Sequence, residues 1–133
     1  MMKDETVRQA LSLSEEWDKL GNGALTQGCI VARSEYVEQN PNAVEAFLTA
    51  YEDSITYMND EGAQADAAAL VAEFGITANE KIAMKAIPQC NLVCVRGQEM
   101  KDMLTGFYDV LFQASPAAVG GAMPADGFYY GVG

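Results

Sequence analysis

The stretch that decides the fold is residues 40–58, which read NPNAVEAFLTAYEDSITYM. Its large apolar side chains recur every three or four positions, a spacing that places them on one face of an α-helix. They are Val44, Phe47, Leu48, Tyr51, Ile55 and Met58. Asn40 can cap this helix, and Pro41 suits its first turn, where a backbone N–H would have no partner. The segment therefore predicts a long amphipathic helix.

Three more helices are predicted downstream of this one. They cover residues 63–72, residues 80–87, and a segment from about Gln98 to Ser115. Asp60 can cap the first of them, and Gly75 stands where a left-handed C-terminal cap is expected. Thr77 and Glu80 have capping-box spacing, and Pro88 stops the helix that they begin.

Upstream of residue 40 the sequence predicts one short helix and strands. Residues 7–13 alternate as a strand does, and Ser14 is expected to cap a helix that ends before Gly21. Residues 29–32 and 92–95 are short apolar runs, typical of strands buried on both faces. We therefore expect a helix-rich α/β chain with about four helices and two to three short strands. So small a sheet cannot cover four amphipathic helices, so the chain is either a helical bundle with minor strands or lacks part of its sheet.

Composition and charge exclude several classes of function. The chain has 133 residues, with 19 acidic and 8 basic side chains and a net charge of −11. This charge disfavours binding to nucleic acid and to anionic membranes. No apolar run approaches the roughly 20 residues of a transmembrane helix, and the N-terminus lacks the apolar core of an export signal.

The residues that carry catalysis or bind metals are scarce. With no histidine, the chain has neither a Ser-His-Asp nor a Cys-His arrangement, and a zinc site would be short of ligands. We therefore expect no enzyme, no metal and no cofactor. Cys90 and Cys94 are expected to pack as small apolar residues, although a Cys29–Cys90 disulfide is an alternative in an oxidising compartment.

The order of elements resembles a known family. Residues 28–48, GCIVARSEYVEQNPNAVEAFL, have the form strand, basic residue, short helix, Asn-Pro and long helix. This is similar to the second inter-domain crossing of type 2 periplasmic binding proteins. The nearest group resembles the binding proteins for thiamine pyrimidine precursors, nitrate, taurine and alkanesulfonates. The stretches AIPQCN (86–91), GQEMK (97–101) and FYY (128–130) look like that group too.

This resemblance implies the C-terminal portion of a longer, two-lobed protein. Residues 1–25 would be the end of the second lobe and a hinge crossing, and residues 26–133 the returning part of the first lobe. The implied function is the solute-binding component of an ABC importer, which holds a small organic solute between its lobes and docks on a permease. The full-length protein would be periplasmic or lipid-anchored outside the cell. The alternative is a free-standing helical module that is stable as a homo-oligomer.

Four residues are candidate ligand contacts. Thr26, Gln27 and Gly28 precede the predicted strand at residues 29–32, where backbone and side-chain amides can orient a polar ligand. The alternative is that they form only a hinge turn. Trp17, the one tryptophan, can stack on a heteroaromatic ligand, and the alternative is a role in the core or on a lobe surface. The carboxylate pairs Glu15/Glu16 and Glu35/Glu38 are interpreted as solvated faces.

Overall fold

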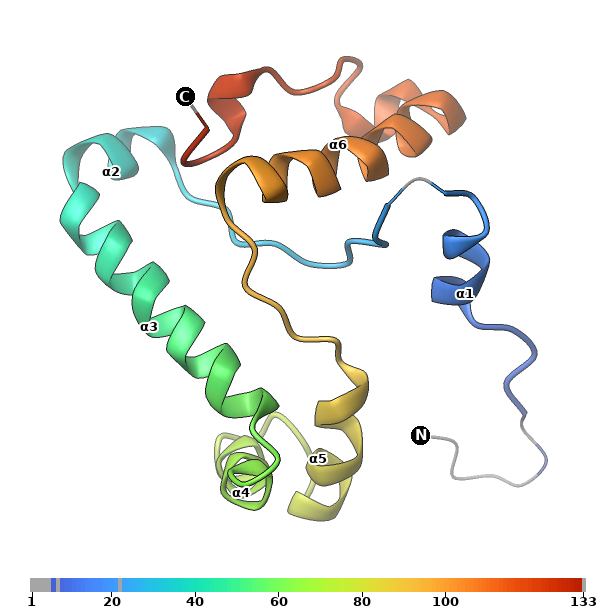
Figure 1. Cartoon of the computed structure of the whole chain (residues 1–133), viewed down its shortest axis with the longest axis vertical. Coiled ribbons are helices and arrows are strands. Elements are labelled where there is room, and N and C mark those ends of the chain that lie inside the picture. The colour runs from blue at the N-terminus through green and yellow to red at the C-terminus, as the bar shows by residue number, and fades with distance from the viewer. Residues whose placement is uncertain (1–5, 7, 22, 133) are drawn as a thin grey trace. The chain divides into compact units, whose positions relative to one another are not determined.

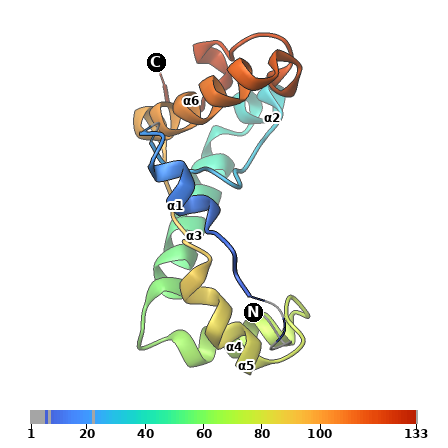
Figure 2. The ribbon, with the colours of Figure 1, turned by 90° about the vertical axis from the view of Figure 1, so that its right-hand side faces the viewer.

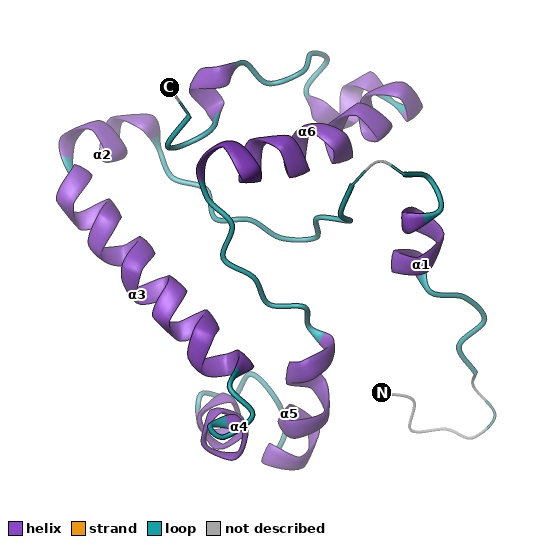
Figure 3. Ribbon diagram, viewed as in Figure 1, coloured by secondary structure: helices purple, strands orange, loops and turns teal. Residues whose placement is uncertain are grey.

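The computed structural model describes residues 6, 8–21 and 23–132, and every regular element within them is helical (Figures 1 and 3). The α-helices are α1 (Leu13–Asp18), α2 (Ser34–Gln39), α3 (Pro41–Asn59), α4 (Gln64–Glu73), α5 (Glu80–Ala86) and α6 (Gly97–Ala114). Short 3-10 helices follow at Ile87–Gln89, Pro116–Val119 and Asp126–Phe128. The predicted α/β class is therefore wrong, because the described part of the chain is all-α.

The predicted strands fail because they have no neighbours to pair with. Residue 7 lies outside the described residues, and the rest of that segment leads directly into α1. Residues 29–32 and 92–95 belong to irregular segments with no strand beside them in the described part of the chain. Ile30, Val31 and Val93 are 50%, 78% and 62% exposed. A strand exists only where a second segment completes its ladder of hydrogen bonds, so an apolar run alone does not make one.

The chain forms two compact units. Among the described residues, unit 1 comprises residues 31–94, and unit 2 comprises those between 6 and 30 together with those from 95 to 132. Unit 2 is therefore built from two segments of the chain that are separated by unit 1. The lobe boundary predicted between residues 25 and 26 refers to a longer protein and stays a prediction. The chain passes from one unit to the other at residues 30/31 and 94/95.

Unit 1 has a small core where α4 and α5 lie side by side (Figures 1 and 2). Its buried residues are Ala67 and Ala68 from α4, Ala83 from α5 and Ile87 from the 3-10 turn that follows. Alanine allows two helix backbones to approach closely, so this core is narrow. The C-terminal end of α3 reaches it through Met58, which is partly buried.

The two ends of α3 confirm one predicted signal and correct two. Pro41 occupies its first turn, as predicted. Asn40 stands at the N-cap position, but its side chain donates to the carbonyl of Tyr36 at 3.0 Å and so binds the end of α2 instead. Asp60 was expected to cap the helix predicted at residues 63–72. It ends α3 instead, and its Oδ1 accepts the N–H of Gly62 at 2.8 Å.

The ends of α4 and α5 were predicted more closely. Gly75 follows α4 with φ of +70°, which confirms the left-handed cap. The capping box predicted from Thr77 is displaced by two residues, because Asn79 is the N-cap of α5 and accepts the N–H of Ile82 at 3.1 Å. The hydroxyl of Thr77 donates to the carbonyl of Asn79 at 3.1 Å.

Unit 2 is organised around α6, which ends at Ser115 as predicted. Leu104 of α6 is buried. The C-terminal segment returns to the first turns of this helix, where Lys101 Nζ lies 2.8 Å from Asp126 Oδ1. α1 begins slightly earlier than predicted, since Ser12 rather than Ser14 is its N-cap. In the described part of the chain, no helix is long and apolar enough to cross a membrane.

Candidate functional site

The candidate site in unit 2 is an aromatic group formed by Trp17, Phe107 and Tyr108, here called the Trp17 cluster. The ring centroids of Trp17 and Phe107 lie 5.4 Å apart with a tilt of 47°. Phe107 and Tyr108 are neighbours on α6, with centroids 6.1 Å apart. The indole N–H of Trp17 donates to the carbonyl of Gly23 at 2.9 Å, which satisfies its only polar atom. α1 is thus held to α6 by ring packing and to the following loop by a hydrogen bond.

Tyr108 of α6 lies near Cys29, the residue that follows the predicted ligand segment. Partial burial raises the pKa of the Tyr108 hydroxyl, and the nearby Cys29 and Tyr129 raise it further. The environment therefore favours the neutral hydroxyl of Tyr108 over its phenolate. Cys29 directly follows Gly28, so the extended segment that carries the candidates passes close to Tyr108.

Thr26 contributes a buried polar atom. Its hydroxyl oxygen is buried and has no hydrogen-bond partner in the described part of the chain. An unsatisfied buried hydroxyl costs on the order of 1–3 kcal/mol, so it marks a place where a polar group of a ligand would be stabilised. Gln27 and Gly28 lie exposed beside it along the chain. No turn or regular element is assigned to these residues, and the hinge role considered as their alternative stays a prediction.

The structure therefore packs Trp17 against α6 and places Cys29, which follows the candidate segment, near Tyr108 of the same helix, and the sequence did not predict either. Three residues near the candidate site were not identified from the sequence: Phe107, Tyr108 and Tyr129. The available signals were the apolar face of the fourth predicted helix, which includes Phe107, and the aromatic tail. Of the aromatic tail, Tyr129 is 5% exposed and therefore packs against the protein. Its neighbour Phe128 is 60% exposed.

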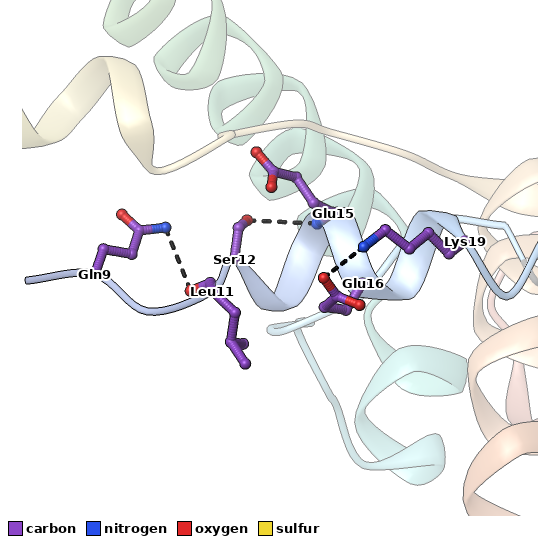
Figure 4. A network of polar contacts seen from close by, with 6 residues as sticks. All are labelled: Gln9, Leu11, Ser12, Glu15, Glu16 and Lys19. Carbon is purple, nitrogen blue, oxygen red and sulfur yellow. Dashed lines mark hydrogen bonds and ion pairs between the residues drawn. The ribbon is translucent and has the colours of Figure 1, made fainter.

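The acidic residues of α1 do not form a catalytic pair (Figure 4). Glu15 and Glu16 are both exposed, and Glu16 pairs with Lys19 at 2.6 Å. Ser12 caps the helix by accepting the N–H of Glu15 at 3.4 Å. Glu35 and Glu38 on α2 are exposed as well, so the interpretation of both pairs as solvated faces is confirmed.

The cysteines are free thiols and only one is partly shielded. Cys29 and Cys90 are exposed, and Cys94 is half-buried. The expectation that Cys90 packs as a small apolar residue is wrong, because it caps the 3-10 turn at the surface. Within the described residues, no group of three potential metal ligands comes together. A shallow open hollow in unit 1, at the start of α5, is lined by Ala72, Asn79, Glu80 and Lys81.

The chain was compared with protein families, with curated proteins and with solved structures. No family model matches it, and no curated protein or solved structure does.

Proposed function

We propose that this chain is part of the solute-binding component of an ABC importer and binds a small organic solute without chemical change. The observation that carries the proposal is the discontinuous unit 2, in which the described residues between 6 and 30 fold together with residues 95–132. The chain therefore passes between compact units twice, as a two-lobed receptor requires. The family resemblance of residues 28–48 includes the first of these passages.

The ligand contacts in this proposal come from unit 2. The Trp17 cluster offers aromatic surface to a planar or apolar part of the solute. The Thr26 hydroxyl supplies a hydrogen bond that it does not make within the described chain. Gln27, exposed beside it, adds an amide that can donate and accept. The permease of the importer is the protein partner, and the protein acts outside the cytoplasmic membrane.

The test is a titration that follows the fluorescence of Trp17, the only tryptophan. A pyrimidine thiamine precursor, taurine, an alkanesulfonate and nitrate are added separately to the full-length protein that carries this sequence. One of them is expected to change the emission with saturable binding. Thr26→Val keeps the side-chain shape and removes the hydroxyl, so we expect it to weaken binding by roughly tenfold.

Thr49→Val in α3 is the matched control, because its hydroxyl already bonds to the carbonyl of Glu45 at 3.0 Å. It should leave solute affinity unchanged. Failure of all four solutes to bind, or equal losses from the two substitutions, would count against the proposal.

A further inference from the structure

The apolar face of α3 is only partly covered within the described residues, where Val44, Leu48, Tyr51, Ile55 and Met58 are half-buried. None of its 19 residues is buried. Only its C-terminal end reaches the core, through Met58. Phe47, two turns into the helix, is 51% exposed. An amphipathic helix normally gains most of its stability by burying its apolar face. The part of this face that stays open around Phe47 is therefore a candidate binding surface.

Two aromatic rings already form a platform on this face. The rings of Phe47 and Tyr51 are stacked, with centroids 5.9 Å apart and planes at 20°. The two residues are one turn apart, so their backbones are held by the helix. When a partner packs on these rings, they lose little conformational entropy, and this favours tight binding.

The charged side chains in the stretch of sequence that contains this face all have one sign. Residues 34–80 contain no lysine and no arginine. Within the same stretch there are ten carboxylates: Glu35, Glu38, Glu45, Glu52, Asp53, Asp60, Glu61, Asp66, Glu73 and Glu80. Glu52 is one turn from both Leu48 and Ile55 on the helix surface, so it borders the apolar face. A partner that covers the face must bring apolar side chains flanked by positive ones.

We propose that the apolar face of α3 binds a basic amphipathic helix of a partner protein. The apolar side of that helix would pack on Phe47 and Tyr51, and its lysines or arginines would lie beside Glu52. A second copy of the chain fits poorly, because its own α3 would bring a second Glu52 to the border of the face and no lysine or arginine to pair with the first. Anionic lipid and nucleic acid are disfavoured by the same charge. The proposal does not depend on solute binding.

The probe is a labelled 18-residue peptide of leucine and lysine, with leucines spaced to form one face of a helix. Fluorescence anisotropy with the whole chain measures its binding. A peptide of the same composition with scattered leucines, and one with glutamate in place of lysine, serve as controls. The amphipathic basic peptide is expected to bind at least roughly tenfold more tightly than either, and to weaken as salt is added.

Two substitutions test the aromatic contact. Phe47→Ala is expected to lower the affinity for the basic peptide by roughly tenfold, whereas Phe47→Leu should retain part of that affinity. Phe74→Ala is the control, because Phe74 ends α4 and is 76% exposed. It should change affinity less than about twofold. Circular dichroism establishes that each variant keeps its helices.

Two further substitutions distinguish binding to this defined face from attraction by the net charge of the chain. Glu52→Gln and Asp53→Asn each remove one charge from α3, but neighbouring residues of a helix point about 100° apart. Only Glu52→Gln should weaken binding and lower its dependence on salt. Equal effects of both, or equal binding of the peptide with scattered leucines, would overturn the proposal. A dimer that Phe47→Ala dissociates in sedimentation would also overturn it, since a second copy would then occupy the face.

Discussion

Trp17 and Phe107 pack against each other, with ring centroids 5.4 Å apart, although ninety residues separate them in the chain. This contact joins the two segments of unit 2, because Trp17 lies in the first and Phe107 in the second. Ring packing across so long a stretch of chain forms only when unit 2 folds as a whole. Trp17 is therefore a local reporter of the folding of this unit.

The first prediction follows from that contact. Phe107→Ala removes the ring against which Trp17 packs, so the indole should become more hydrated and its emission should move to longer wavelength. Because both rings are only partly buried, we expect a loss of about 1–2 kcal/mol of unfolding free energy, below the range for a fully buried Phe. Denaturant titration followed by fluorescence measures both effects. Phe74→Ala in unit 1 should leave the emission maximum in place, and an unshifted maximum in Phe107→Ala would contradict the contact.

The second prediction concerns the ion pair that holds the returning tail. The pKa of Lys101 is raised above 10.5, mainly by its hydrogen bond to Asp126. The charges of Asp126, Asp102 and Tyr129 raise this pKa further, and burial lowers it. A raised pKa means that the folded state binds the proton more tightly than the unfolded state does. The stabilisation is therefore complete below pH 10.5 and disappears as the pH rises through the raised value.

Asp126→Asn should accordingly lower the stability of unit 2 at pH 8 and have no effect at a pH where Lys101 is neutral in both states. Unfolding in urea, followed by Trp17 fluorescence at a series of pH values, measures the difference. Asp109→Asn removes a charge from an exposed position of α6 and serves as the control. A difference between Asp126→Asn and the unchanged protein that does not vary with pH would show that the ion pair is not its source.

Local signals in this sequence predicted local structure, and contacts between distant segments escaped them. Pro41, Gly75 and Ser115 mark helix ends correctly, because each acts through its own backbone geometry or its own hydrogen bonds. The apolar residues of 29–32 and 92–95 are compatible with a strand, but a strand needs a partner that local pattern does not reveal. The Trp17 cluster was missed for the same reason, since no sequence signal connected Trp17 to Phe107.

The third prediction tests the close approach of two glycines in unit 2. Gly97 begins α6 with φ of +59°, and a Cβ placed there would lie 3.4 Å from the carbonyl oxygen of Gly131. Gly97→Ala should cost on the order of 1–2 kcal/mol, because an L residue is strained at positive φ and the tail would have to shift. Gly127→Ala is the control, since a Cβ there meets open space and its φ lies outside the left-handed region. Equal unfolding midpoints for the two variants would contradict the described start of α6.

The last prediction addresses the N-cap of α5, where the capping residue differs from the one expected. The side chain of Asn79 accepts the N–H of Ile82 at 3.1 Å and so satisfies one of the free donors in the first turn. Asn79→Ala should cost about 1 kcal/mol, seen as faster hydrogen exchange at the amides of Ile82 and Ala83. Asn79→Asp should restore slow exchange, because a carboxylate can also accept the N–H of the first turn and is stabilised by the positive end of the helix dipole. Asn42→Ala, at an exposed position of α3, should leave exchange in α5 unchanged. If Thr77 were the effective cap, Thr77→Ala would speed this exchange more than Asn79→Ala does.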